Sequence, residues 1–410
     1  MKTVVQKFGG SSLATPELRE IAASRVLETR ARGVAPVVVC SALGRAPDPY
    51  ATDSLLAMLG PSRSGPNRDL LLACGELIGA AVFAELLTSW GARAQAMSGA
   101  QAGIVTDDRY GDARILRVDP ANVIAALQTG IIPVVAGFQG VTAGGALATL
   151  GRGGSDLTAI ALGNALGSES VEIFTDVSGV MSADPRQVAG AHTIDRASYA
   201  EMSELAAEGA KVMHSKAAEL AHATGTPYVV KGLRTNFGTT IDDEKEPGDH
   251  PVTGIASKHE LAFVHVRDAA TSQVGARPHV ALFGRLAERG VSIDMINVNA
   301  AGVFFVVAAP RGDEVRAELA AMQMEGSVRA GCATISIVGL GMRGAPGVMH
   351  RVVRALAACS VDIIHSTDSN ITITVLVAMQ DEGRALQALH DEFHLEQFQA
   401  AGGTGEEAIA

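Results

Sequence analysis

Two glycine-rich loops constrain the fold of this chain more than any other feature, because each lies between an apolar run and a helical pattern. The first loop, residues 7–12 (KFGGSS), follows the β-branched residues 3–5. Thr15 and Pro16 then suit the cap and the first position of a helix. Glycines let backbone N–H groups approach an anion, and Lys7 adds a positive charge. Taken alone, this stretch fits a phosphate loop and an ordinary tight turn equally well.

The second loop, residues 149–156 (TLGRGGSD), leads into the helical pattern of residues 157–166. It carries both Arg152 and Asp156. An arginine fork suits a carboxylate or a phosphate, whereas an aspartate can orient a metal ion or a lysine. Asp156 can also act as a simple helix N-cap, and the two roles do not exclude each other.

Strand and helix patterns alternate through residues 3–230, which predicts an open, mainly parallel α/β sheet sandwiched by helices. Asp176 ends one of the predicted strands, and open α/β sheets place ligands at the carboxyl ends of their strands. Glu76 lies inside an apolar helical stretch. A carboxylate there is either paired and functional or simply on the outer face of the helix.

Composition narrows the function classes. The 410 residues, 47% of them hydrophobic, predict a globular chain of about two to four domains. A net charge of −11 argues against nucleic acid as a partner. The four cysteines form no C-x-x-C pair, which argues against structural zinc and disulfides and fits a reducing cytoplasm. Residues 120–151 are uncharged, but their glycines and Pro133 favour a buried strand and a loop over a membrane span.

The chain has neither a P-loop signature nor the protein-kinase motifs. Its two loops still offer a set suited to phosphoryl transfer, which needs positioning and charge neutralisation more than a covalent nucleophile. The members of this set are Lys7, Arg152, Asp156, Asp176 and Lys211. No His and Cys cluster with metal-ligand spacing is present in the sequence, so no protein metal site is expected. Any metal ion is then Mg²⁺ arriving with a nucleotide.

These motifs resemble those of aspartokinases. The matching segments stand in the family's order, at residues 5–12, 74–76, 136–140, 151–156 and 175–186. The resemblance covers residues 4–393 and implies an amino-acid kinase fold followed by regulatory ACT domains. It also implies a cytoplasmic enzyme that uses ATP and Mg²⁺ to phosphorylate the β-carboxylate of L-aspartate. That reaction is the first step towards lysine, threonine, methionine and diaminopimelate.

The resemblance also implies roles for individual residues. Catalysis is assigned to Lys7, Arg152, Asp156 and Lys211. Nucleotide contacts are assigned to Lys7, Phe8, Gly9, Gly10, Ser11, Ser41, Thr175, Asp176, Met181, Asp184, Pro185, Arg186 and Lys211. Aspartate contacts are assigned to Thr52, Glu76, Arg152, Gly153, Gly154 and Ser155. A substrate carboxylate is already ionised at neutral pH, so no general base is required.

The C-terminal half contains a weak repeat, because Leu286 and Val291 correspond to Leu356 and Val361, 70 positions later (361 minus 291). Each repeat reads as a βαββαβ unit. We expect a catalytic domain at residues 1–243, a linker at 244–259, ACT-like domains at 260–329 and 330–400, and a flexible tail at 401–410. The G-x-G-x-x-G match at residues 339–344 is rejected as a dinucleotide site, because Pro346 delays the helix that should follow it.

The similarity to ACT domains implies feedback regulation by lysine, threonine or meso-diaminopimelate, and a homo-oligomer formed by ACT–ACT pairing. The expected effector contacts are Asp294, Met342, Gly347, Val348, Ser366 and Asp368. Residues 48–53 and 366–373 look most like the diaminopimelate-sensitive subgroup. Two alternatives are weighed: a glutamate or N-acetylglutamate kinase of the same fold, and a catalytically silent amino-acid sensor. Glu76 and the paired tail disfavour the first, and the intact set around Lys7 disfavours the second.

Overall fold

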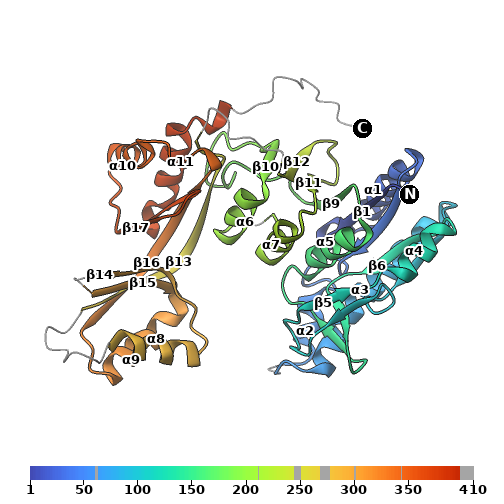
Figure 1. Cartoon of the computed structure of the whole chain (residues 1–410), viewed down its shortest axis with the longest axis horizontal. Helices are drawn as coiled ribbons and strands as arrows, with labels where there is room; N and C mark the ends of the chain where they lie inside the picture. The colour runs from blue at the N-terminus through green and yellow to red at the C-terminus, as the bar shows by residue number, and fades with distance from the viewer. Residues whose placement is uncertain are drawn as a thin grey trace. The chain divides into compact units, whose positions relative to one another are not determined.

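The computed structural model describes residues 1–60, 63–210, 212–243, 251–267, 278–299, 302–342 and 344–397 (Figure 1). Its contacts divide the chain into two compact units. The first unit consists of Met1–Val180, Thr193–Ala207 and Lys211–Glu246. The second consists of Met181–His192, Glu208–Ala210 and Pro247–Ala410. Residues 181–192 therefore pack with the C-terminal half of the chain, although they follow a strand of the first unit in sequence.

An eight-stranded sheet forms the centre of the first unit, in the order β10-β12-β11-β9-β1-β2-β6-β3. Its strands are β1 (Thr3–Phe8), β2 (Ala35–Cys40), β3 (Ala94–Met97), β6 (Ile132–Ala136), β9 (Ser170–Thr175), β10 (Arg196–Ser198), β11 (Tyr228–Gly232) and β12 (Gly238–Asp242). Every neighbouring pair is parallel except β11 and β12. The mainly parallel sheet is confirmed, and its buried centre explains the near-continuous apolar runs.

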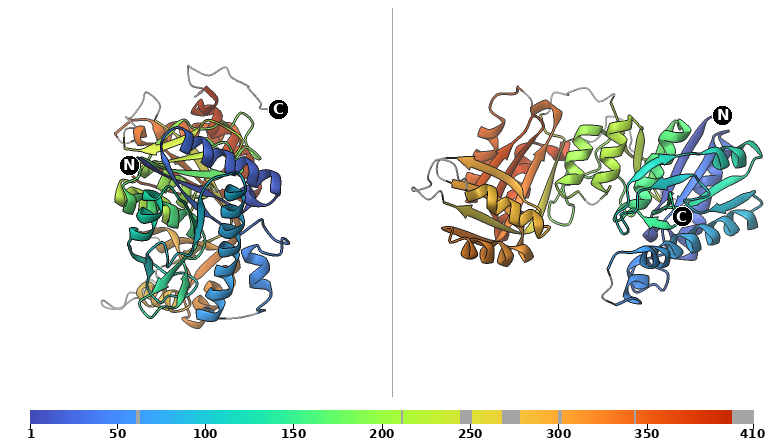
Figure 2. Two further views of the ribbon diagram at one scale, coloured as in Figure 1. Left: turned by 90° about the vertical axis from the view of Figure 1, so that its right-hand side faces the viewer. Right: turned by 60° about the horizontal axis from the view of Figure 1, so that its bottom comes forward.

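Helices cover both faces of this sheet (Figures 1 and 2). The helices of the first unit are α1 (Pro16–Ala31), α2 (Thr52–Ala57), α3 (Pro66–Ser89), α4 (Ala121–Gln128), α5 (Gly154–Leu166), α6 (Tyr199–Ala207) and α7 (Ser215–Thr224). α1 and α3 share one core cluster with Phe8 and Val38. Because successive side chains of a strand point to opposite faces, Lys7 points away from that cluster and towards α5.

A second, four-stranded sheet in the first unit was not predicted. It runs in the order β5-β4-β7-β8, from β4 (Ile104–Thr106), β5 (Ile115–Val118), β7 (Gln139–Thr142) and β8 (Leu147–Thr149). These strands have only three or four residues each, which is too short for a clear alternation. β8 ends where the second loop begins, so this small sheet sets the start of that loop.

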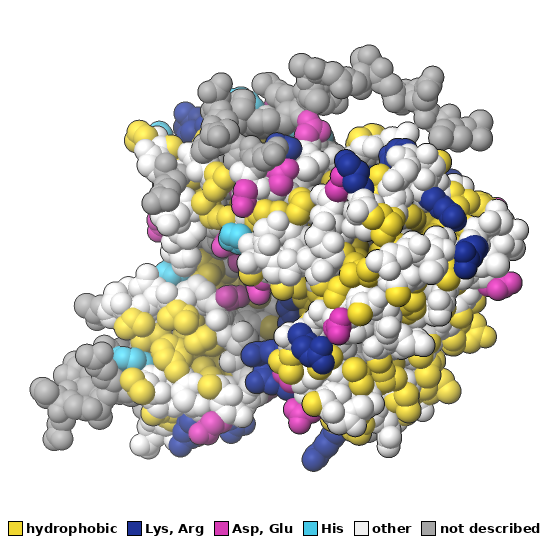
Figure 3. Space-filling model, turned by 45° about the vertical axis from the view of Figure 1, so that its right-hand side comes forward, with side chains coloured by type: hydrophobic (Ala, Val, Ile, Leu, Met, Phe, Trp, Pro, Cys, Tyr) yellow, Lys and Arg dark blue, Asp and Glu magenta, His cyan; other side chains and the backbone are white. Residues whose placement is uncertain are grey.

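Among the described residues, α3 alone is long and apolar enough to cross a membrane. Half of its apolar window is buried inside the fold, as is common for the core helix of a globular domain. On the face shown in Figure 3, Lys and Arg side chains alternate with Asp and Glu among the described residues. This mixed surface agrees with the net charge of −11 and offers no continuous basic stripe on that face.

The second unit contains a six-stranded antiparallel sheet in the order β14-β15-β13-β16-β18-β17. Its strands are β13 (Gly254–Val266), β14 (Asp294–Asn299), β15 (Gly302–Ala308), β16 (Gly326–Val338), β17 (His365–Asp368) and β18 (Thr372–Ala378). Its helices are α8 (Pro278–Glu288), α9 (Gly312–Ala321), α10 (Val348–Ala358) and α11 (Glu382–Glu392).

The two repeats share their long central strands, which corrects the expected domain boundaries. β13 and β16 pair along their whole length, from Gly254 opposite Val338 to Val266 opposite Gly326. The first half of β13 therefore completes the sheet of the second repeat. Residues 254–259 belong to this strand and not to a linker, and the expected boundary at 329/330 lies inside β16. A strand that serves two repeats is defined by tertiary pairing, which sequence order does not reveal.

Candidate active site

A buried ion pair joins the two glycine-rich loops. Lys7 lies near the end of β1, and its Nζ is 2.6 Å from Oδ1 of Asp156 in the first turn of α5. Both side chains are only 12% exposed. Asp156 is therefore the partner of Lys7 and not the N-cap of α5, because Gly153 occupies the cap position. The pair places a positive charge at the carboxyl end of a central parallel strand, where α/β sheets bind ligands.

The first loop continues into a 3₁₀ turn, η1 (Gly10–Leu13), before α1 begins. α1 starts at Pro16, and Thr15 caps it by accepting a hydrogen bond from the Leu18 N–H. The predicted cap is confirmed, but α1 does not begin at the glycines. Phe8 is fully buried and stacks on Phe174 at 4.8 Å, so its side chain belongs to the core. Only its backbone can serve the predicted nucleotide contact.

The second loop enters α5 directly and is fixed by a buried aspartate that sequence reasoning missed. Asp69 of α3 accepts hydrogen bonds from the backbone N–H groups of Thr149 (2.6 Å) and Gly111 (2.9 Å). Gly153 adopts a left-handed conformation (φ 70°), which favours glycine. The Arg152 side chain beside it is exposed and makes no hydrogen bond or ion pair with the described residues. A free guanidinium at this position can bind a carboxylate bidentately.

Glu76 is buried at the centre of α3, with 2% of its surface exposed. One of its oxygens, Oε1, accepts a hydrogen bond from the Ala42 N–H at 3.3 Å, and the hydroxyl of Thr52 also donates to the carboxyl group. The other oxygen, Oε2, has no partner among the described residues. Thr52 and Glu76 were both predicted to contact aspartate, and the fold brings them together.

Two glycines let the loop after β2 lie directly on α3 beside this carboxyl group. A Cβ at Gly79 would come within 2.6 Å of the Ser41 carbonyl oxygen, and one at Gly75 within 2.9 Å of the Tyr50 carbonyl oxygen. Burial raises the pKa of Glu76 to about 8, although hydrogen bonds from its own backbone, Ala42 and Thr52 oppose this rise. Glu76 is therefore mostly protonated at neutral pH until a cation pairs with it.

The predicted nucleotide residues at the end of β9 have an unexpected partner. The Thr175 hydroxyl donates to Asp176 Oδ1 at 3.1 Å, and Arg45 lies 3.2 Å from Asp176 Oδ2. This ion pair is exposed, so it contributes little to stability. Sequence reasoning missed Arg45, although its position after β2, at the carboxyl end of another parallel strand of the same sheet, was an available signal.

The other predicted nucleotide residues that the structure describes are divided between the two units. Met181, Asp184, Pro185 and Arg186 belong to the second unit, where Arg186 pairs with Asp184 at 2.6 Å. Lys211 lies outside the described residues. Gly9, Gly10 and Ser11 follow β1, and Ser41 follows β2, so all four lie at the carboxyl ends of adjacent strands.

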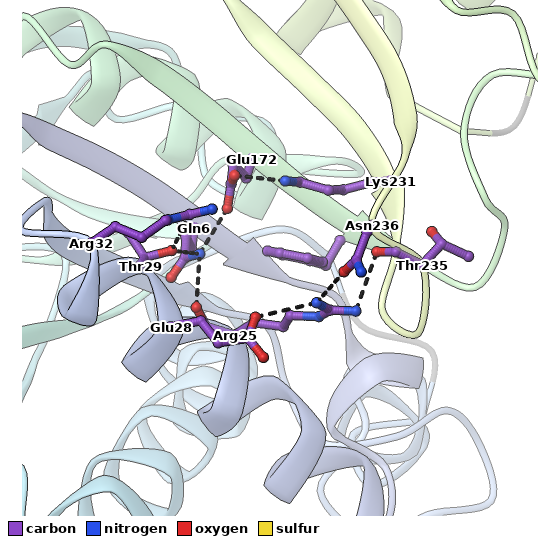
Figure 4. Close-up of a pocket in the computed structure, with 10 residues that line it drawn as sticks. Gln6, Arg25, Glu28, Thr29, Arg32, Glu172, Lys231, Thr235 and Asn236 are labelled. Atoms are coloured by element: carbon purple, nitrogen blue, oxygen red, sulfur yellow. Dashed lines mark hydrogen bonds and ion pairs between the residues drawn. The ribbon is translucent and has the colours of Figure 1, made fainter. Parts of the chain in front are cut away.

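A cavity of about 140 Å³ lies on the opposite face of the first unit's sheet (Figure 4). Gln6 lines it, and its side chain contacts Thr29 of α1 at 2.9 Å. Glu172 is held on both oxygens in this cavity, because Lys231 Nζ lies 2.6 Å from its Oε1 and Gln6 Nε2 donates to its Oε2 at 2.7 Å. Gln6 and Lys7 are successive residues of one strand, so this cavity is separated from Lys7 by the sheet.

The predicted effector residues divide into core and edge positions. Met342 and Val348 are buried in the core of the second repeat, so their side chains are structural. Gly347 precedes α10 with φ 91°. Asp294 lies on β14, and Ser366 and Asp368 lie on β17; these are the two edge strands of the sheet.

Comparisons with known families agree with this geometry. The amino acid kinase family matches residues 2–232, and an ACT domain family matches residues 335–393. The parallel sheet, the two glycine-rich loops and the Lys7–Asp156 pair thus define a nucleotide-using amino acid kinase joined to a regulatory domain.

The relatives narrow this class. Aspartokinase 1 of Bacillus subtilis is 38% identical over 410 residues, which cover 96% of this chain and 100% of the relative. The aspartokinase of Corynebacterium glutamicum is 38% identical over 414 residues, covering 96% and 97%. The structure of Escherichia coli aspartokinase III with aspartate and ADP superposes with a TM-score of 0.77 at 26% identity, covering 95% and 99%. The chain belongs to the aspartokinase family. It is an aspartate kinase, and its ACT domain indicates allosteric regulation.

Proposed function

We propose that the first unit transfers the γ-phosphoryl group of ATP to the β-carboxylate of L-aspartate, giving 4-phospho-L-aspartate and ADP. The observation that carries this proposal is the buried carboxyl group of Glu76, whose Oε2 has no partner among the described residues. A buried carboxylate with a free oxygen suits the ammonium group of an amino-acid substrate. The exposed guanidinium of Arg152, which has no partner among the described residues, suits a substrate carboxylate. An N-acylated substrate would lack the ammonium group and leave Glu76 unpaired.

The Lys7–Asp156 pair provides the charge for phosphoryl transfer. A β-carboxylate oxygen of aspartate bonds to the γ-phosphorus, while the bond to the bridging oxygen of ADP breaks. Lys7 neutralises the charge of the transferring group, and Asp156 holds the Lys7 ammonium in place. No proton has to be removed, because the attacking carboxylate is already ionised.

Mg²⁺ fits this site as the companion of ATP. The Asp156 carboxylate has a second oxygen besides the Oδ1 that pairs with Lys7, so it can also orient a hydrated Mg²⁺ ion. When bound, the ion neutralises the β- and γ-phosphates. The family resemblance supports further proposed contacts with the nucleotide. They come from Lys211, Met181 and residues 184–186.

We further propose that an end-product amino acid, which is lysine, threonine or meso-diaminopimelate, regulates the enzyme through the second unit. E. coli aspartokinase III, 26% identical, has been solved with lysine and aspartate. The edge strands β14 and β17 offer unpaired backbone groups, which favours pairing with a second copy of the chain. The four cysteines are free thiols, which suits a cytoplasmic enzyme.

Hydroxylamine trapping tests the substrate. The chain, ATP, Mg²⁺ and hydroxylamine are incubated with L-aspartate, L-glutamate or N-acetylglutamate, and the hydroxamate is measured. We expect product with aspartate and at most traces with the other two. The Glu172→Gln variant serves as control and should form product like the parent, because the Glu172 side chain is also mostly buried, at 12% exposed, but lies on the other face of the sheet. Equal product from N-acetylglutamate, or none from aspartate, contradicts the proposal. Regulation is tested by adding the three amino acids singly and in pairs, and an unchanged rate in every mixture contradicts it.

A further inference from the structure

The end of α11 brings together three side chains that the sequence did not mark as a site. His390, Asp391 and Glu396 each offer one ligand atom, and these atoms lie within 4.8 Å of one another. His390 is fully buried, whereas the two carboxylates are exposed. Glu396 comes from the short turn η5 (Leu395–Gln397), which follows α11. All three residues belong to the second unit.

One ring nitrogen of His390 is hydrogen-bonded, and the other has no hydrogen-bond partner among the described residues. Its Nε2 lies 3.0 Å from the hydroxyl oxygen of Ser182, which also accepts a hydrogen bond from the His192 backbone N–H at 3.1 Å. The Ser182 hydroxyl can give its own proton to His192 Nδ1, 3.4 Å away, and accept the His390 Nε2–H. This arrangement leaves a lone pair on His390 Nδ1. No described residue hydrogen-bonds to that nitrogen, and Oε2 of Glu396 lies 4.0 Å from it.

The surroundings favour a neutral imidazole facing a cation. Burial lowers the pKa of His390, although Glu396 and Asp391 act in the opposite direction and His192 adds to the lowering. A neutral ring is the form that binds metals. The site also lies at the C-terminal end of α11, where the helix dipole favours positive charge.

We propose that His390, Asp391 and Glu396 bind a divalent transition-metal ion, with Zn²⁺ as the best fit. One imidazole nitrogen with carboxylate oxygens is a ligand set for such ions, whereas Mg²⁺ and Ca²⁺ prefer oxygen alone. Bonds of about 2.0–2.1 Å in a tetrahedron place ligand atoms about 3.3 Å apart. The observed 4.0 Å between His390 Nδ1 and Glu396 Oε2 closes to this value by rotation of the exposed glutamate.

A second imidazole and a supporting hydrogen bond lie beside this cluster. Nδ1 of His394 lies 4.0 Å from Oε1 of Glu396, so a second imidazole faces the same carboxylate. Gln387 holds Oδ1 of Asp391 at 2.8 Å and leaves its other oxygen for the ion. Metal-binding histidines usually donate their second N–H to a protein group, which is the role that Ser182 has towards His390. The ion would therefore fix residues 181–192 within the second unit.

Metal binding to the full chain tests the proposal directly. The protein is stripped with a chelator and titrated with Zn²⁺ in competition with a chromophoric chelator. Co²⁺ is then added to record its visible absorption, which intensifies in tetrahedral sites. We expect one equivalent of tightly bound ion. Glu396→Gln and Asp391→Asn should each lower the affinity by at least about tenfold, because loss of a group that only supports a ligand already costs that much at other metal sites.

The matched control is His259→Asn, because His259 Nδ1 lies 3.8 Å from a single glutamate, Glu382, in the same unit. This variant should bind Zn²⁺ like the parent chain. Zn²⁺ should also raise the unfolding temperature of the parent and of His259→Asn, but not that of Glu396→Gln. Removal of the buried His390 risks misfolding, so the test uses the two exposed carboxylates. Zn²⁺ affinity that is absent in the parent, or unchanged in both carboxylate variants, overturns the proposal.

Discussion

We expect the raised pKa of Glu76 to make aspartate binding strongly pH-dependent. A protonated Glu76 cannot pair with the substrate ammonium group, so binding first requires loss of that proton. With a pKa of about 8, only about one-tenth of the free enzyme carries the charged carboxylate at pH 7. The apparent KM for aspartate therefore scales as one plus the ratio of protonated to ionised Glu76. It should fall about fiftyfold between pH 6 and pH 8, and level off above pH 8.

The Glu76→Gln variant separates this effect from other titrations. An amide keeps the shape of the protonated acid but cannot ionise. The lost charge-assisted contact contributes about 1.5–3 kcal/mol, so KM for aspartate should rise about 10–100-fold at pH 8. The KM of this variant should no longer depend on pH, while KM for ATP stays within about twofold of the parent value. Glu172→Gln, on the other face of the sheet, should retain the parent profile.

The assay is initial-rate ADP formation at saturating ATP, with aspartate varied at each pH from 6 to 9. Two results would refute the reasoning. One is a flat KM profile in the parent chain, which would mean that Glu76 is already ionised or does not contact the substrate. The other is a pH dependence that persists unchanged in Glu76→Gln.

Three further predictions follow from the same contacts. Lys7→Met should lower kcat by about 10²–10³, whereas Lys231→Met, which breaks an equally short ion pair with Glu172 on the other face, should lose similar stability but little activity. Equal kcat losses in both would contradict the role of Lys7. Arg152→Lys should raise KM for aspartate about tenfold, because lysine lacks the bidentate guanidinium. It should leave stability unchanged, because the exposed guanidinium has no partner among the described residues. An unchanged KM would contradict the proposed contact between Arg152 and aspartate. Glu76 holds its proton in the folded state between its ordinary pKa and about 8, so the free energy of unfolding should fall as pH rises through that window. Denaturant unfolding at pH 5 and pH 9 should show this fall in the parent and not in Glu76→Gln.

Local signals explain why much of the first unit was predictable. Runs rich in apolar and β-branched residues marked β1, β2, β6 and β9, because strands at the centre of a parallel sheet are buried on both faces. Thr15 and Pro16 marked the start of α1, because capping needs only neighbouring residues. Asp156 was expected to orient either a lysine or a metal ion, and the structure pairs it with Lys7.

Features that depend on distant contacts were not predictable. The partner of Asp176 is Arg45, 131 positions away, and nothing in either loop specifies this pairing. Asp69 lies in the first turn of α3, where acidic residues are common, yet it accepts hydrogen bonds from the backbone N–H groups of Gly111 and Thr149. Ser182 and His390 are 208 positions apart, so their contact exists only in the folded second unit. The shared strands β13 and β16 misled the boundary prediction for the same reason.

The attacking atom in phosphoryl transfer is the central claim, and an oxygen label follows it. L-Aspartate with both β-carboxylate oxygens replaced by ¹⁸O is incubated with the chain, ATP, Mg²⁺ and hydroxylamine, and the released phosphate is analysed by mass spectrometry. If a β-carboxylate oxygen bonds to the γ-phosphorus, hydroxylamine displaces phosphate that carries one ¹⁸O atom. Phosphate without ¹⁸O, formed at the same rate as ADP, would show that water attacks ATP and would contradict the account.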